Sequence, residues 1–213
     1  MFVGERMSRP VITVTPDTPV HDTLAMFKKE RIRRAPVVQD GKLVGIVSAS
    51  DLMNASPSPV TSLSVWEMNY LISKVTVKQV MSKKVITVDV NTPIEEAARI
   101  MADKKFGGVP VVRSGKLVGI ITETDLFKIF LELMGARTKA MRVTAEIEDK
   151  PGSLAKITKA VADAGGNFVS FGQFVDDDPS CKILTFKIAG MKKEDIKKVL
   201  SKHVKKFWDI RQS

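Results

Sequence analysis

The sequence has few of the side chains on which enzymes and metal sites depend. Its 213 residues include two histidines and one cysteine. Cys181 cannot form an internal disulfide, which agrees with a reducing compartment. A nucleophile and base pair would need His21 or His203 beside a serine or Cys181, and no spacing indicates one. Zinc-ligand spacing, a P-loop and a GxGxxG motif are also missing. We therefore expect a non-catalytic protein with no metal site and no required cofactor.

Long hydrophobic runs are missing as well. No stretch of 18 or more apolar residues occurs, and charges interrupt the opening MFVGERMSRP where a signal peptide needs apolar residues. We expect a soluble, cytoplasmic protein that has no membrane partner. Apolar residues still make up 44% of the chain, which is enough for packed cores in two or three small domains.

Positive charge is plentiful but evenly spread. The net charge of +10 divides into +3 for residues 1–80, +3 for 81–140 and +4 for 141–213. Such a field favours small anions in general and does not by itself mark a duplex-binding surface. Seven lysines within 192–206 alternate with the apolar Ile196, Val199, Leu200 and Val204, which predicts a solvated helix face. A nucleic-acid-binding regulator and a small-molecule catabolic enzyme are the two alternatives.

One segment occurs twice, 74 residues apart. Met7–Leu52 aligns without a gap over Met81–Leu126, and the hexapeptide GKLVGI is identical in both copies. Each copy predicts a short strand VITV, a helix, a hairpin and a second helix. The sheet of one copy would leave its apolar face uncovered, so we expect the two copies to pack together. Each helix is predicted to begin with a threonine N-cap and a first-turn proline, at Thr18-Pro19 and at Thr92-Pro93. The expected apolar helix faces are Val20, Leu24 and Phe27 in the first copy and Ile94, Ala98 and Met101 in the second. The expected hairpin turns are Asp40-Gly41 and Ser114-Gly115.

A polar motif follows each hairpin. The motif is SASD from Ser48 to Asp51 in the first copy and TETD from Thr122 to Asp125 in the second. A hydroxyl residue followed three positions later by an acid is a capping box, which satisfies the free amides at a helix start. The same geometry attracts phosphate, and a fixed carboxylate can accept two hydrogen bonds from a ribose diol. Capping alone and capping with ligand contact both remain open.

The pattern VITV…TP…PVV…GKLVGI(V/I)(S/T)xxDL, present twice over about residues 7–128, resembles tandem cystathionine-β-synthase (CBS) domains. The resemblance implies repeat 1 over residues 1–62, a connecting helix over 63–80 and repeat 2 over 81–138. It also implies clefts between the repeats that bind adenosine-containing ligands, with AMP, ADP, ATP and S-adenosylmethionine as candidates. The contact residues that it implies are Thr13, Arg33, Arg34, Pro36, Ser48, Asp51, Thr87, Val109, Pro110, Thr122 and Asp125.

The resemblance also implies that the two clefts differ. In nucleotide-sensing relatives an arginine three residues before the proline of PVV contacts phosphate. Arg33 has that place in the first copy and Gly107 in the second. One cleft would then suit phosphate and the other an uncharged or cationic adenosyl group. A solvated arginine edge is the alternative for Arg33, and strand propensity alone explains Thr13 and Thr87. In the segment between the copies, Leu63, Trp66 and Tyr70 have helical spacing, which predicts a core or subunit contact.

From Met141 onward the pattern predicts the ferredoxin-like order β-α-β-β-α-β, which gives an α+β fold class for the chain. The expected strands are MRVTAEI, Phe168–Val175, Cys181–Ile188 and a last one near Phe207–Ile210. The expected helices begin at Pro151-Gly152 and span Lys192–Val204. Leu154, Ile157, Val161 and Ala164 would form the apolar face of the first helix, and Asp176 to Asp178 predict a hairpin tip rather than an ion site.

The segment 141–213 resembles an ACT domain, a regulatory module that binds amino acids, most plainly at DKPGSL from Asp149 to Leu154 and at Asn167. The resemblance implies an amino-acid site lined by Asp149, Gly152, Ser153 and Leu154, with Asn167 approaching from a partner subunit of a homodimer. A module that only dimerises is equally open. The order of domains as a whole resembles the acetoin-utilisation accessory protein family. That resemblance implies a regulatory protein whose partner is an unknown metabolic enzyme or another regulator. No acetoin-specific chemistry occurs in the sequence.

Overall fold

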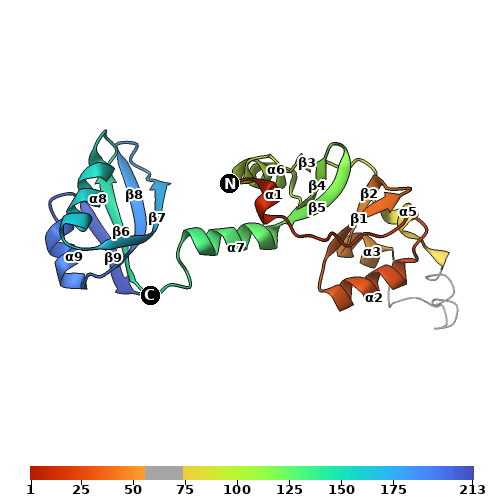
Figure 1. The fold of residues 1–213 in the computed structure, drawn as a ribbon, viewed down its shortest axis with the longest axis horizontal. Coiled ribbons are helices and arrows are strands. Elements are labelled where there is room, and N and C mark those ends of the chain that lie inside the picture. Colours follow the sequence, from red (N-terminus) through yellow and green to blue (C-terminus); the bar gives the residue numbers. More distant parts are fainter. Residues whose placement is uncertain (56–73) are drawn as a thin grey trace. The chain divides into compact units, whose positions relative to one another are not determined.

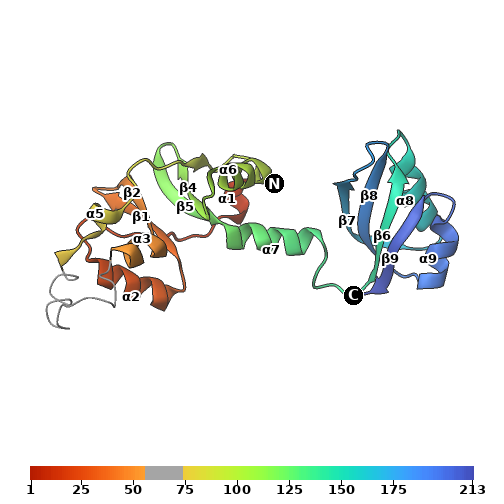
Figure 2. The ribbon, with the colours of Figure 1, turned by 180° about the vertical axis from the view of Figure 1, so that it is seen from behind.

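The computed structural model describes residues 1–55 and 74–213, and these residues form two compact units, Met1–Leu126 and Phe127–Ser213 (Figures 1 and 2). Most of the predicted connecting helix over 63–80 lies outside the described residues, as do Leu63, Trp66 and Tyr70. Within the described ranges, no helix is both long and apolar enough to cross a membrane.

The first unit contains the two repeats in equivalent order (Figure 1). A short helix α1 (Val3–Arg6) precedes the first repeat, which comprises α2 (Val20–Glu30), β1 (Arg34–Gln39), β2 (Lys42–Ser48) and α3 (Ala49–Asn54). A short helix α5 (Val77–Val80) precedes the second repeat, which comprises β3 (Val88–Asp89), α6 (Ile94–Lys104), β4 (Gly108–Arg113), β5 (Lys116–Thr122) and the start of α7 (Glu123–Leu133). The first unit ends within α7, at Leu126.

The predicted hairpins are confirmed, and their turns have the same geometry. β1 and β2 pair in antiparallel register around Asp40 and Gly41, and β4 and β5 pair around Ser114 and Gly115. All four turn residues have positive φ, at 49° and 75° in the first turn and 49° and 76° in the second. Two successive positive φ values match the right-handed twist of the strands, and glycine takes the second of them without steric cost.

Three details of the predicted repeat are wrong. VITV forms no continuous strand, because Val14 makes a single parallel bridge to Val37 and only Val88–Asp89 pairs with β4. The threonines do not cap the helices, since Pro19 and Pro93 are themselves the N-cap residues of α2 and α6. The threonine hydroxyls instead close the preceding turns by accepting hydrogen bonds from the backbone N–H of Thr15 and of Asp89, both at 3.1 Å. Ala97, not Ala98, takes the fully buried position of α6.

The core of each repeat is completed by the segment that precedes the other repeat. Val3 and Met7 pack in the second repeat with Val88, Ala97 and Val109. Val77 and Met81 pack in the first repeat with Val20, Phe27 and Val37. Backbone bonds fix both segments, from Val3 N–H to Thr92 O and from Val77 N–H to Thr18 O, each at 2.9 Å. The two repeats are thereby tied together through both of their leading segments.

This exchange explains the second glycine of GKLVGI. A Cβ atom on Gly45 would lie 2.6 Å from Met81 Sδ, and one on Gly119 would lie 2.4 Å from Met7 Sδ. Real Cβ atoms do not approach other atoms so closely, so each glycine leaves room for a methionine of the crossing segment. The first glycine of the hexapeptide serves the turn and the second serves the packing between repeats.

The second unit has the predicted ferredoxin-like topology. Its elements are β6 (Met141–Glu148), α8 (Ser153–Asp163), β7 (Asn167–Val175), β8 (Cys181–Ala189), α9 (Lys193–Leu200) and β9 (Lys206–Gln212). The antiparallel sheet has the order β7-β8-β6-β9, and α8 and α9 cover one of its faces (Figure 1). Ile157, Val161, Ile196 and Leu200 pack from the helices onto Phe186 of the sheet. The predicted face of α8 is wrong at its ends, because Leu154 is 37% exposed and Ala164 is also exposed.

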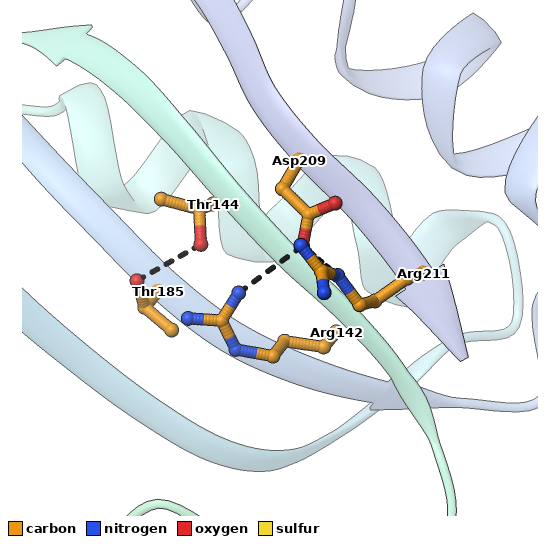
Figure 3. A network of polar contacts seen from close by, with 5 residues as sticks. All are labelled: Arg142, Thr144, Thr185, Asp209 and Arg211. Carbon is orange, nitrogen blue, oxygen red and sulfur yellow. Dashed lines mark hydrogen bonds and ion pairs between the residues drawn. The ribbon is translucent and has the colours of Figure 1, made fainter. Parts of the chain in front are cut away.

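Polar residues lie on the other face of this sheet. Arg142 Nη1 and Arg211 Nε both donate to Asp209 Oδ2, at 3.2 and 2.6 Å, and the hydroxyls of Thr144 and Thr185 lie 3.2 Å apart (Figure 3). The buried Lys187 donates from Nζ to the carbonyl oxygens of Gly135 and Thr138, both at 3.0 Å, and of Ser213 at 3.3 Å. Lys187 therefore attaches the segment after α7 and the end of β9 to the sheet.

Candidate functional site

A pocket of about 510 Å³ lies between the two repeats of the first unit. Among the described residues, four cationic side chains and one acid, Asp51, line it. The excess of positive charge suits an anionic ligand. The first repeat contributes Arg33, Arg34, Ile46, Ser48, Ala49, Ser50, Asp51 and Met53, and the second contributes Ser82, Lys84, Val85, Ile86, Lys105, Phe106, Gly107, Gly108 and Pro110.

The N-terminus of α3 fixes the carboxylate of Asp51 in this pocket. Ser48 is the N-cap, and its Oγ accepts the backbone N–H of Asp51 at 3.3 Å. Asp51 Oδ2 in return accepts the backbone N–H of Ser48 at 2.8 Å and its hydroxyl at 2.7 Å. This is the predicted capping box. Asp51 Oδ1 accepts no hydrogen bond from the described residues, so one oxygen of a rigidly placed carboxylate is free for a ligand.

The equivalent carboxylate of the second repeat is fully engaged. Asp125 Oδ2 accepts the backbone N–H and the hydroxyl of Thr122, at 2.9 and 2.7 Å. Asp125 Oδ1 accepts the Ser8 hydroxyl at 3.1 Å, and Asp125 is only 6% exposed. Ser82, which corresponds to Ser8, donates no such bond to Asp51 within the described part of the chain. The two motifs look alike in sequence, but in the structure only Asp51 has an uncommitted oxygen.

Arg34 contributes a half-buried charge to the pocket. A Cβ atom on Gly107 would lie 2.0 Å from Arg34 Nη2, so the guanidinium occupies the space that a side chain there would need. Burial lowers the pKa of Arg34, as does the positive charge of Arg33, while the negative charge of Glu123 acts in the opposite direction. A desolvated guanidinium gains more from an incoming anion than a solvated one, because less water must be removed.

The pocket brings together five of the residues expected from the sequence and leaves the others outside. Arg33, Arg34, Ser48, Asp51 and Pro110 line it. Pro36 and Val109 are buried, Thr13 and Thr87 are exposed and line no part of it, and Thr122 and Asp125 are at the corresponding place in the second repeat.

Sequence reasoning missed several residues of this pocket. Lys84, Val85 and Ile86 come from the segment before β3, and Lys105 and Phe106 come from the end of α6. Ile86 and Phe106 are both 38% exposed, so each leaves apolar surface open beside the pocket. The sequence signal for these residues was weak, because Lys84 aligns with a proline in the first copy and Lys105 with an arginine.

A smaller pocket, of about 420 Å³, surrounds the loop between β6 and α8 in the second unit. Asp149, Gly152, Ser153 and Leu154 line it as expected, and Asn167 does not. Gly152 is the N-cap of α8 with φ of 83°, and Lys182 Nζ lies 3.2 Å from Asp149 Oδ2. The loop therefore has a fixed shape before any ligand binds.

The paired repeats and the pocket between them define a class of ligand-binding regulatory module. The sequence model of the CBS domain matches residues 3–58 and 77–132, which together are more than half of the chain. The chain belongs to the CBS domain family and contains a tandem CBS pair. This confirms the resemblance seen in the two copies of the hexapeptide.

Relatives of the chain range from small proteins to large enzymes. A CBS domain-containing protein of Dictyostelium discoideum is 29% identical over 136 residues, which cover 63% of this chain and 94% of the relative. The inosine-5'-monophosphate dehydrogenase of Korarchaeum cryptofilum is 34% identical over 120 residues, which cover 56% of this chain and 22% of the enzyme. The match thus spans almost all of the first relative but about a fifth of the second.

Solved structures of similar chains include ligand complexes. The CBS domain pair of protein MJ0100, in complex with 5'-methylthioadenosine and S-adenosyl-L-methionine, has a TM-score of 0.52 and 28% identity, covering 65% of this chain and 98% of that chain. CBSX2 in complex with AMP has a TM-score of 0.51 and 32% identity, covering 61% and 96%. A Vibrio cholerae protein provisionally named as the acetoin utilization protein AcuB has a TM-score of 0.54 and 30% identity, covering 64% and 95%.

Proposed function

We propose that this protein is a non-catalytic cytoplasmic sensor that binds an adenosine-containing nucleotide between its CBS repeats and modulates a metabolic partner. The observation that carries the proposal is the geometry of Asp51, which has one oxygen fixed by the capping box and the other free in a cationic pocket. Two similar structures contain AMP, or S-adenosylmethionine and methylthioadenosine, which supports adenosine as the common part of the ligand.

Each part of the nucleotide has a plausible contact in the pocket. The free oxygen of Asp51 would accept hydrogen bonds from the ribose hydroxyls. Arg33, Lys84 and Lys105 would bind phosphate, and Phe106 with Ile86 would contact the base. Since four cations face one acid, this pocket favours AMP, ADP or ATP over the cationic S-adenosylmethionine. The place around Asp125 would accept an adenosyl group only if the ligand displaced Ser8 from the carboxylate.

The test is calorimetric titration of AMP, ADP, ATP and S-adenosylmethionine into the wild-type protein, Asp51→Ala and Asp125→Ala. Both variants lose a helix cap, so a comparison of the two separates ligand contact from general damage. We expect nucleotide affinity to fall at least about tenfold in Asp51→Ala, because a charge-assisted hydrogen bond contributes about 1.5–3 kcal/mol, and to change little in Asp125→Ala. A wild-type protein that binds none of the four ligands would refute nucleotide sensing.

The second unit is proposed to be an ACT domain that binds an amino acid at the loop from Asp149 to Leu154. The backbone amides at the start of α8 would bind the ligand carboxylate. Asn167 would complete the site from the second subunit. A thermal-shift screen of the twenty amino acids, repeated with Asn167→Ala, tests this. Stabilisation that survives the substitution excludes a role for Asn167. If no amino acid stabilises the wild-type protein, amino-acid binding is refuted and dimerisation is the remaining role of the domain.

A homodimer is proposed because α7 has several exposed apolar side chains. Phe127 is 68% exposed, Phe130 50% and Leu133 58%. A second copy of the chain would cover them. Light scattering should give twice the mass of 23.5 kDa for the wild-type protein and a monomer for Phe127→Asp/Phe130→Asp. Lys128→Glu is the charge control on the same helix, and a monomeric wild-type protein would end this proposal.

A further inference from the structure

A basic pocket lies in the second unit, outside the nucleotide cleft. Its volume is about 460 Å³. Its lining includes four lysines and one histidine, and Glu148 is the one acid that lines it in the part of the chain that the structure describes. The cationic members are Lys150, Lys156, Lys202 and Lys205, and the remaining members are Glu148, Ser153, His203 and Val204.

The acid of this pocket is already paired. Glu148 forms an ion pair with Lys150, and this contact lowers the pKa of Glu148. The charges of Lys205 and Lys156 lower the same pKa further. Three cations therefore lie close enough to one point to act on a single carboxylate. Lys156 and Lys202 have no acidic partner within the described residues, so the pocket retains positive charge after Glu148 is neutralised.

Two segments far apart in the chain place these cations around one hollow. Lys150 and Lys156 come from the loop and first turns of α8, and Lys202 and Lys205 come from the segment between α9 and β9. Lys205 is fixed by its backbone N–H, which donates to Glu146 O at 2.8 Å, and by its Nζ, which donates to Cys181 Sγ at 2.8 Å. The arrangement is concave, in contrast to the exposed lysines along α9, which explains why the sequence pattern indicated only a solvated helix face.

We propose that this pocket binds a compact polyanion with two or more phosphate groups, such as pyrophosphate, triphosphate or the phosphate chain of a nucleotide. Lysine ammonium groups bind phosphate as point charges, and the Ser153 hydroxyl adds a donor. Within residues 1–55 and 74–213, no phenylalanine, tyrosine or tryptophan lines the pocket, so the phosphates and not a base would supply the recognition. The site is distinct from the nucleotide cleft in the other unit, and it shares Glu148, Lys150 and Ser153 with the pocket of the proposed amino-acid site.

The experiment is calorimetric titration of the whole protein with inorganic tripolyphosphate at physiological ionic strength. We expect saturable binding that weakens at least tenfold in Lys156→Ala/Lys202→Ala. The matched control is Lys197→Ala/Lys198→Ala, which removes the same charge from the exposed part of α9, outside this pocket. The control should bind within twofold of wild type. Equal weakening in both double variants would show diffuse attraction to the positive chain and would overturn the proposal.

A second arm separates this site from the nucleotide cleft. Arg33→Ala removes the proposed phosphate contact in the first unit. If tripolyphosphate binding is lost in Arg33→Ala and kept in Lys156→Ala/Lys202→Ala, the ligand binds in the nucleotide cleft, and the proposal of a polyanion site in the second unit is refuted. A single-stranded oligonucleotide is titrated in parallel. Oligonucleotide binding tighter than that of tripolyphosphate, and weakened by the control substitutions too, would indicate a nucleic-acid surface and would also refute it.

Discussion

The guanidinium of Arg34 lies against the backbone of Gly107, where a Cβ atom would stand 2.0 Å from Nη2. Arg34 begins β1 of the first repeat, and Gly107 immediately precedes β4 of the second. Gly107 aligns with Arg33 of the first copy, so the copy with glycine at this place provides the space in which the next arginine of the other copy, Arg34, lies. The two repeats differ in sequence here, and the difference lets the side chain of one fit against the backbone of the other. Both residues line the nucleotide pocket.

Gly107→Ala should couple energetically to Arg34. The new methyl group would meet the flexible end of Arg34, so we expect the protein to fold and Arg34 to move. In Arg34→Ala the same methyl group meets no guanidinium. A double-mutant cycle on the stability of the protein should give a coupling energy of at least about 0.5 kcal/mol. Thermal unfolding by calorimetry measures it, and strictly additive effects would contradict the contact.

Gly45→Ala and Gly119→Ala should both destabilise the first unit, by about 1–3 kcal/mol each, because the added methyl groups overpack the contacts with Met81 and Met7. Met81→Ala should relieve part of the cost of Gly45→Ala and none of the cost of Gly119→Ala. Met7→Ala should show the reverse pattern. Calorimetric melting of the four single variants and the four glycine–methionine double variants checks this, and rescue by the wrong methionine would disprove the exchange of leading segments.

Lys187→Met should loosen the segment after α7. The substitution retains apolar volume but removes the donor shared by the carbonyl oxygens of Gly135, Thr138 and Ser213. Loss of hydrogen bonds from a charged donor costs about 1.5–3 kcal/mol. We expect a lower melting temperature of the second unit and faster amide exchange at residues 135–141. Lys193→Met, at an exposed position of α9, is the control and should leave both quantities unchanged.

Asp209→Asn should reduce the acid sensitivity of the second unit. The hydrogen bond from Arg211 lowers the pKa of Asp209, and the charges of Arg211 and Arg142 lower it further, against an opposing effect of burial. A carboxyl group whose pKa is lower in the folded state stabilises the fold above its unfolded pKa of about 3.9, and this contribution disappears as the pH falls through the folded value. The wild-type advantage in melting temperature should thus be present at pH 6 and should shrink below about pH 4. If the difference in melting temperature between the wild type and Asp209→Asn stays constant with pH, the pairing of Asp209 with Arg142 and Arg211 is ruled out. The control is Asp177→Asn, at the exposed hairpin tip.

Much of the fold could be predicted because its signals are local. Asp40-Gly41 and Ser114-Gly115 favour tight turns by their own backbone preferences, and the hydroxyl of Ser48 caps a helix with a partner three residues away. The threonine caps were misplaced by one residue for the same local reason, since the hydroxyls had a competing acceptor role in the preceding turn.

The candidate site was predictable only in part. Arg33, Ser48 and Asp51 belong to motifs, whereas Lys84, Ile86 and Phe106 reach the pocket through the packing of one repeat against the other. The sequence also did not reveal which of the carboxylates of Asp51 and Asp125 has an oxygen free of hydrogen bonds. The bond that engages Asp125 comes from Ser8, which is 117 positions away in the chain. Spacing within a motif carries no information on such a contact.

The sequence by itself determined that two copies of one half-module exist, that each contains a hairpin and a capped helix, and that a ferredoxin-like unit follows. Turn preferences, capping and apolar periodicity act over a few residues, so a linear pattern is sufficient to specify them. Tertiary structure decided which leading segment completes which core, which carboxylate retains a free oxygen and which lysines meet around a hollow. These properties depend on distances between residues far apart in the chain, and such distances exist only after the repeats and the sheet have packed.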